Sequence, residues 1–146
     1  MNWENEIKER LYKYPKRKCA IANLKERILY LEDAMTAVKP VTMDKVPLRD
    51  GGTKHEDVMI NNMMELADLK INLRFCEREV AEIDKALKIL TDTEYRVIEL
   101  FYLTLYRTSI QRISEELTYE KSQVYNIRNA AIKKLTIYLY GREYTH

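Results

Sequence analysis

Five side chains in the last quarter of the chain have the types and spacing needed to contact the edges of DNA bases. They are Ser122, Tyr125, Asn126, Asn129 and Lys133. Their separations of three, one, three and four residues place them along one face of a helix, which we call the polar stripe. Lys121 and Gln123 stand at its leading end. Amide, hydroxyl and ammonium groups near the start of a helix can hydrogen-bond to base edges in the major groove.

The segment that carries the polar stripe is basic, although the chain as a whole is close to neutral. The net charge of the chain is +2, whereas residues 121–142 contain five basic side chains and no acidic one. The basic residues are Lys121, Arg128, Lys133, Lys134 and Arg142. We expect the last four of these to bind phosphates, which position a protein on DNA without reading its sequence. The alternative interpretation is a solvated basic face on a plain helical corner.

Two helices joined by a tight turn are expected to position the polar stripe. Residues 110–117 predict the first helix, after a cap at Ser109, and residues 121–140 predict the second, which ends at Gly141. The side chains expected to hold the two helices together are Ile113, Leu117, Tyr119, Val124, either Ile127 or Arg128, Ala131 and Leu135. This spacing is typical of a helix-turn-helix motif.

The first ninety residues have the pattern of a long helical hairpin. We expect helices over residues 3–14 and 16–38, with Pro15 interrupting the first or beginning the second. A loop should follow over residues 39–53. A capping box that begins at Thr53 then predicts a helix that continues to residue 90.

This last helix repeats apolar side chains every seven residues at two positions, as a coiled coil does. One position holds Met59, Leu66, Leu73, Val80 and Leu87, and the other holds Asn62, Leu69, Cys76, Ile83 and Leu90. Asn62 either sets the register of the coiled coil or lies at a solvent-facing end. We call these two heptad positions the seam of the long helix. This helix is longer than the helix over residues 16–38, which therefore covers only part of the seam. The rest is left for residues 3–14 or for a second subunit to cover.

A second capping box, from Thr91 to Glu94, predicts that a new helix starts after residue 90. The apolar face expected on this helix consists of Tyr95, Ile98, Phe101, Tyr102 and Leu105. We therefore divide the chain into a coiled-coil-like arm, residues 1–90, and a helix-turn-helix domain, residues 91–146.

The composition favours an all-α protein, because only three Gly and three Pro leave few places to turn. No apolar run approaches the roughly 18 residues that span a bilayer. The start of the chain has no secretion signal, so we expect a cytoplasmic location. Cys19 and Cys76 are expected to be small buried apolar side chains. No residues have the spacing of a metal site, a catalytic site or a cofactor-binding loop, so we expect no enzymatic activity.

The C-terminal third of the chain resembles region four of bacterial sigma factors. The similarity rests on the segments Leu90–Tyr102, Ile113–Leu117 and Val124–Leu135. Upstream, residues 45–52 and the acidic pair Glu56 and Asp57 are similar to a loop and a helix start in phage regulators of the ArpU and RinA kind. The resemblance implies a DNA-binding regulator of phage or prophage genes, including late genes, in a bacterial host.

Two residues depart from the sigma factor pattern. The turn commonly has Gly where this chain has Thr118, so a residue poorly suited to positive φ must adopt that conformation. The second helix commonly begins after Ser or Asp where this chain has Glu120, which is a weaker N-cap.

Together these features predict a sequence-specific transcription regulator of phage genes that binds double-stranded DNA and acts as an activator. We expect it to form a homodimer through the arm and to contact RNA polymerase. One alternative is a DNA-packaging subunit similar to the phage small terminase, which also joins a helix-turn-helix to coiled-coil helices. The other is a protein-interaction module that grips a polymerase subunit.

Overall fold

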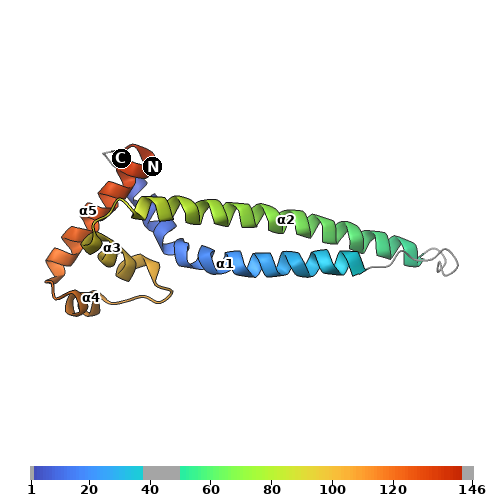
Figure 1. Cartoon of the computed structure of the whole chain (residues 1–146), viewed down its shortest axis with the longest axis horizontal. Coiled ribbons are helices and arrows are strands. Elements are labelled where there is room, and N and C mark those ends of the chain that lie inside the picture. The colour runs from blue at the N-terminus through green and yellow to red at the C-terminus, as the bar shows by residue number, and fades with distance from the viewer. Residues whose placement is uncertain (1, 38–49, 143–146) are drawn as a thin grey trace. The chain divides into compact units, whose positions relative to one another are not determined.

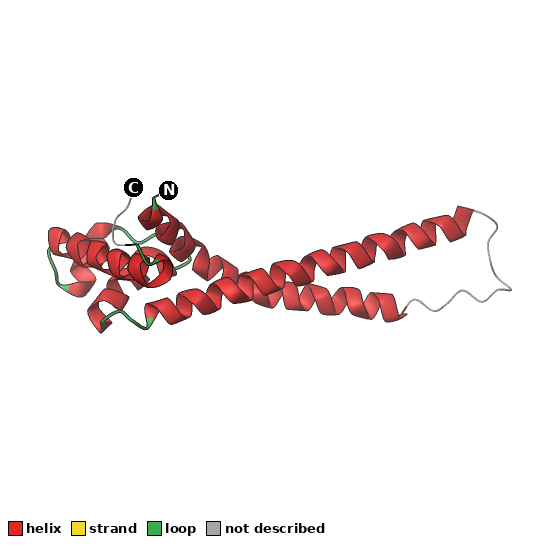
Figure 2. Cartoon of the chain, turned by 90° about the horizontal axis from the view of Figure 1, so that it is seen from above, coloured by secondary structure: helices red, strands yellow, loops and turns green. Residues whose placement is uncertain are grey.

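The computed structural model describes residues 2–37 and 50–142, and every regular element in these two ranges is helical (Figure 1, Figure 2). The elements are α1 (Trp3–Ala37), α2 (Asp50–Leu87), α3 (Asp92–Ile98), the π-helical segment η2 (Glu99–Leu103), α4 (Ile110–Leu117) and α5 (Lys121–Tyr140). The prediction of an all-α fold is therefore confirmed for the described part of the chain.

The chain forms two compact units whose boundary differs from the predicted one at residue 90. Unit 1 contains Met1–Lys18 together with Glu77–His146, and unit 2 contains Cys19–Cys76. The first turns of α1 and the last turns of α2 therefore belong with the C-terminal helices. The physical reason is burial, because Ile7 and Leu11 of α1 are fully buried within unit 1.

Two of the helix boundaries predicted for the arm, the break at Pro15 and the cap at Thr53, are wrong. Helix α1 continues through Pro15, so the predicted break is wrong. A helical proline removes one backbone hydrogen bond, and the burial of Leu11, Tyr14 and Pro15, which share one face, offsets that loss. Helix α2 begins at Asp50, so Thr53 lies inside it and does not cap it.

The early start of α2 also corrects the predicted loop over residues 39–53. Gly51 and Gly52 each cost roughly 1 kcal/mol in a helix. Once a helix has nucleated, each added residue gains one backbone hydrogen bond, and this gain offsets the cost of the two glycines. The rest of the predicted loop lies outside the described residues. The other end of α2 falls at Leu87 instead of residue 90. There Lys88, Ile89 and Leu90 donate to carbonyls three residues back, which closes the helix with tighter turns.

The capping box between Thr91 and Glu94 is confirmed at the start of α3. The backbone N–H of Glu94 donates to the Thr91 hydroxyl at 3.2 Å, and the backbone N–H of Thr91 donates to the Glu94 carboxylate at 2.9 Å. The predicted apolar face beyond this point is only partly right. Ile98 is buried, but Leu105 lies past the end of η2 and is exposed. The wider π-helical turn changes the phase of the side chains, which a regular helical period does not anticipate.

One buried cluster in the C-terminal helices takes a side chain from each of the four elements. Val97, Leu100, Ile113 and Val124 come from α3, η2, α4 and α5, in that order, and form one cluster. The partly buried side chains that pack against it are Phe101, Ile110, Leu117, Tyr119 and Ile127. Four of the side chains expected between these two helices, Ile113, Leu117, Tyr119 and Val124, belong to this cluster, and Ala131 and Leu135 are fully buried.

The turn between α4 and α5 has the predicted conformation. Thr118 adopts φ 58° and ψ 33°, the left-handed region that favours glycine. The Ser114 hydroxyl donates to the Tyr119 carbonyl, and the Tyr119 N–H donates to the Ser114 carbonyl at 3.2 Å. These two hydrogen bonds tie the end of α4 to the turn, so the strained residue is held from both sides.

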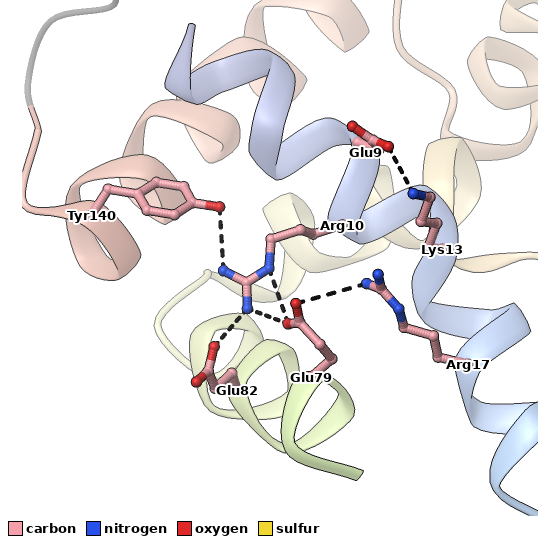
Figure 3. Close-up of polar contacts among 7 residues, drawn as sticks. All are labelled: Glu9, Arg10, Lys13, Arg17, Glu79, Glu82 and Tyr140. Atoms are coloured by element: carbon pink, nitrogen blue, oxygen red, sulfur yellow. Dashed lines mark hydrogen bonds and ion pairs between the residues drawn. The ribbon is translucent and has the colours of Figure 1, made fainter. Parts of the chain in front are cut away.

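An ionic network built on Arg10 joins three helices of unit 1 (Figure 3). The Arg10 guanidinium of α1 donates to Glu79 of α2 at 3.1 Å from Nε, and to Glu82 at 2.6 Å. It also donates to the Tyr140 hydroxyl at the end of α5, at 3.2 Å. Burial by itself would lower the pKa of Arg10, but its hydrogen bonds to Tyr140 and the two carboxylates outweigh burial and raise it. The guanidinium therefore stays charged and links both ends of the chain.

Unit 2 buries much less than unit 1. Among its described residues only Ile28 and Leu31 are buried, both on α1. Ion pairs between α1 and α2, Arg27–Glu65 at 2.8 Å and Lys70–Glu32 at 3.6 Å, are exposed and so contribute little. Cys19 is exposed, which contradicts the predicted burial of this thiol, and Cys76 is half-buried.

Replacing Thr118 by Gly should stabilise the protein, because glycine adopts positive φ without a steric penalty. We expect the free energy of unfolding to rise by about 1 kcal/mol in urea denaturation. Thr118→Ala, which keeps a Cβ, should give no such gain. A Gly variant that is less stable than the native chain would show that the Thr118 side chain stabilises the turn.

Replacing Arg10 by Ala should destabilise unit 1, because it leaves the largely buried Glu79 carboxylate with only Arg17, whose Nη1 lies 4.0 Å from Glu79 Oε1. We expect a loss of about 3 kcal/mol in the free energy of unfolding. Arg27→Ala, which breaks an exposed ion pair, is the matched control and should cost less than about 1 kcal/mol. Equal losses for the two variants would contradict a structural role for the Arg10 network.

Candidate nucleic-acid interface

Helix α5 has one face buried in unit 1 and the polar stripe on its exposed side. It packs against α3 and α4 through side chains that include Val124, Ala131 and Leu135. All five members of the polar stripe are exposed, as are Lys121 and Gln123 at its leading end. The helix from Lys121 to Tyr140 contains no acidic residue, so no carboxylate of α5 itself opposes an approaching phosphate.

Asn126 carries the amide of the polar stripe whose donor and acceptor are both unengaged by the described residues. Within the described residues 2–37 and 50–142, its side chain forms no hydrogen bond. Both its amide donor and its carbonyl acceptor are therefore available. An asparagine amide pairs with the N6 and N7 atoms of adenine through two hydrogen bonds.

Arg128 is held against aromatic rings instead of extending into solvent. Its guanidinium carbon lies 5.1 Å from the ring centre of Phe101 and 4.9 Å from that of Tyr125. Its Nε and Nη2 donate to the side-chain Oδ1 of Asn129 at 3.2 Å and 3.0 Å. The guanidinium is thus oriented beside the polar stripe, and the Asn129 amide nitrogen is left as a donor.

Phe101 is a residue of this region whose role the sequence did not predict. It lies in η2 and supports both Tyr125, at 6.1 Å between ring centres, and Arg128. More than twenty residues separate it from its partners, so only the tertiary packing of η2 against α5 reveals the contact. Sequence spacing within α5 carries no signal of it.

Lys134 lies in a different setting from the other predicted phosphate ligands. Its ammonium donates to the Glu94 carboxylate at 2.8 Å and so connects α5 with the capping box of α3. Burial by itself would raise the pKa of Glu94, but the hydrogen bonds from Lys134 and Thr91 outweigh it and hold that pKa below its usual value. Lys134 is therefore already neutralised by a structural partner.

Arg142 also has a partner within unit 1. Its guanidinium carbon lies 5.8 Å from the ring centre of Trp3 in α1, and Trp3 in turn lies 4.7 Å from Tyr140 between ring centres. Of the predicted phosphate ligands, Lys133 is an exposed member of the polar stripe, Arg128 lies beside the stripe, and Lys134 and Arg142 are engaged with side chains of α3 and α1.

The described residues offer no sign of metal chemistry or of a membrane span. No group of three or more His, Cys, Asp or Glu side chains among them could hold a metal ion. None of the described helices is long and apolar enough to cross a bilayer.

Comparisons with models of protein families, with curated proteins and with solved structures found no match to this chain.

Replacing Glu94 by Gln should weaken the fold in a pH-dependent way. A depressed pKa in the folded state means that the carboxylate stabilises the protein fully above the unfolded pKa of about 4.5. This contribution is lost as the pH falls through the lower folded pKa. In urea denaturation we expect a cost of about 1 kcal/mol at about pH 7, shrinking towards zero as the pH is lowered to about 2.

Glu120→Gln is the control for this experiment, because the Glu120 side chain makes no capping hydrogen bond. Its stability should follow that of the native chain at every pH. A cost of Glu94→Gln that stays constant across the pH series would contradict the account of the charged Glu94–Lys134 pair.

Proposed function

We propose that this protein is a sequence-specific regulator of transcription that binds double-stranded DNA through α5. The observation that carries the proposal is the exposed polar stripe on the acid-free helix α5, which follows α4 across a tight turn at Thr118. A single helix that presents amides and cations on one side fits the major groove, where each base pair offers a distinct set of donors and acceptors.

Six side chains at this interface have a role in the proposed mechanism. Asn126 reads a base, because both halves of its amide are available, and Gln123 and Ser122 add hydrogen bonds from the leading turn of the helix. Lys121 and Lys133 bind phosphates on either side of these readers. Arg128, oriented by the ring of Phe101, adds a third cationic contact.

The regulatory role in this proposal comes from the resemblance to sigma factor region four and to phage regulators of the ArpU and RinA kind. The resemblance to region four covers the elements now described as α3, η2, α4 and α5, and the resemblance to the phage regulators lies upstream, in residues 45–52 and at Glu56 and Asp57. It implies an activator of phage or prophage genes that works beside RNA polymerase in the bacterial cytoplasm. The DNA-binding step can be tested without knowledge of the target genes.

Binding to two duplexes separates the proposed readers from the proposed phosphate ligands. One duplex is selected from a random pool by the native protein, and the other has a mixed sequence. Asn126→Ala should weaken binding to the selected duplex by about tenfold and leave the mixed duplex unaffected. Lys133→Ala should weaken both equally. It should also make the slope of log K against log salt, about −2.7 for three phosphate contacts, shallower by about 1.

Lys134→Ala is the matched control, because Lys134 is paired with Glu94 and is not a proposed phosphate ligand. Its slope should equal that of the native protein at a temperature where circular dichroism shows both to be folded. Fluorescence anisotropy across a salt series measures all of these quantities. No binding at low salt, or an Asn126→Ala loss that is the same on both duplexes, would refute base reading by the polar stripe.

A further inference from the structure

Helix α2 carries an exposed apolar face within unit 2. Its members are Ile60, Met63, Met64, Ile71 and Phe75, whose exposed fractions range from 41% for Phe75 to 67% for Met64. At 3.6 residues per turn these five side chains cover about a third of the circumference of the helix. We call them the apolar face of α2. It lies on the side opposite the half-buried seam residues Leu66, Leu69 and Leu73.

This face is unusual for a chain that stands alone in water. Five large apolar side chains within four and a half turns exceed the scattered exposed residues that a soluble surface normally carries. Unit 2 also buries only Ile28 and Leu31 among its described residues. A helix pair with so little buried apolar surface gains stability when a further helix covers it.

The charges at the two ends of the apolar face indicate what covers it. Glu56 precedes the face and Arg74 lies near its end, and both side chains are exposed. They are eighteen residues apart, which is five helical turns, so they lie on the same side of α2. One edge of the face therefore begins with an acid and ends with a base.

An antiparallel copy of the same helix matches this pattern at both ends. In an interface with two-fold symmetry, each contact occurs twice with the roles of the two copies exchanged. Glu56 of one copy then faces Arg74 of the other at one end, and the reverse pair forms at the opposite end. An unrelated helix would need to present the reversed charge pattern, whereas a second copy of this chain presents it by symmetry.

We propose that the apolar face of α2 binds a second copy of this chain in an antiparallel arrangement, with the two-fold axis next to residue 65. This register places Ile60 of one copy beside Ile71 of the other. The two Met64 side chains meet at the axis. The proposal concerns unit 2 and does not depend on DNA binding by unit 1, so either can fail without the other.

The mass of the full chain in solution gives the first test. Sedimentation equilibrium should show a dimer with twice the 17.5 kDa mass of the chain. Met64→Asp places two charges at the centre of the interface and should raise the dissociation constant of the dimer by at least about a hundredfold. Leu29→Asp is the matched control, because Leu29 is nearly as exposed as Met64 (61% against 67%) but lies on α1, and it should leave the dimer intact.

A charge exchange tests whether the face pairs with itself. Glu56→Arg and Arg74→Glu each create two like-charge contacts, so each variant by itself should dimerise about tenfold more weakly. An equimolar mixture of the two variants should recover native affinity as a heterodimer, and so should the chain that carries both substitutions.

Cysteine cross-linking fixes the direction of the two helices, in a chain where Cys19 and Cys76 are replaced by Ser. Met64→Cys should form a disulfide between copies, whereas Ile60→Cys should not, because its mate lies roughly 15 Å away in the antiparallel register. Three results would overturn the proposal. They are a native chain that is monomeric or larger than a dimer, a dimer unaffected by Met64→Asp, and equal cross-linking at both positions, which indicates a parallel pair.

Discussion

The guanidinium of Arg10 donates hydrogen bonds to carboxylates of α2 and to the Tyr140 hydroxyl at the end of α5. These partners lie 69 and more residues away in the sequence, so one side chain connects the first helix of unit 1 to its last. The Lys134–Glu94 pair fixes α5 a second time, to the start of α3. These contacts hold one side of α5 against the rest of unit 1. Only the opposite side, which carries the polar stripe, is therefore accessible to a ligand.

This arrangement makes one helix contribute to both the core of unit 1 and the proposed DNA interface. Val124 and Leu135 on the inner side of α5 are fully buried, while Asn126 and Lys133 on the outer side are exposed. Arg128 lies between the two sides, with its charge over the ring of Phe101. A rigid helix that carries its polar groups in fixed positions loses little conformational entropy when it binds, which favours specific recognition over loose electrostatic attraction.

The features that could be predicted from the sequence are those set by neighbouring residues. The bounds of α4 and α5, the cap at Ser109, the capping box at Thr91 and the positive φ of Thr118 all depend on contacts within about five residues. The features that were missed depend on contacts with distant residues or on the free energy of extending a helix through unfavourable residues. The continuity of α1 through Pro15, the early start of α2 and the structural partners of Lys134 and Arg142 belong to this second group. The π-helical turn at Glu99 also belongs here, because no simple period encodes it.

The most direct test of the central claim is to watch the side-chain amides of the native protein by NMR while short duplex DNA is added. If α5 enters the groove, the amide signals of Asn126 and Asn129 should shift as complex forms. Those of Asn61 and Asn72, which are equally polar and exposed but lie on α2, should stay in place. Shifts at Asn61 and Asn72 with none at Asn126 and Asn129, or no shift at any of the four, would contradict recognition of DNA by the polar stripe.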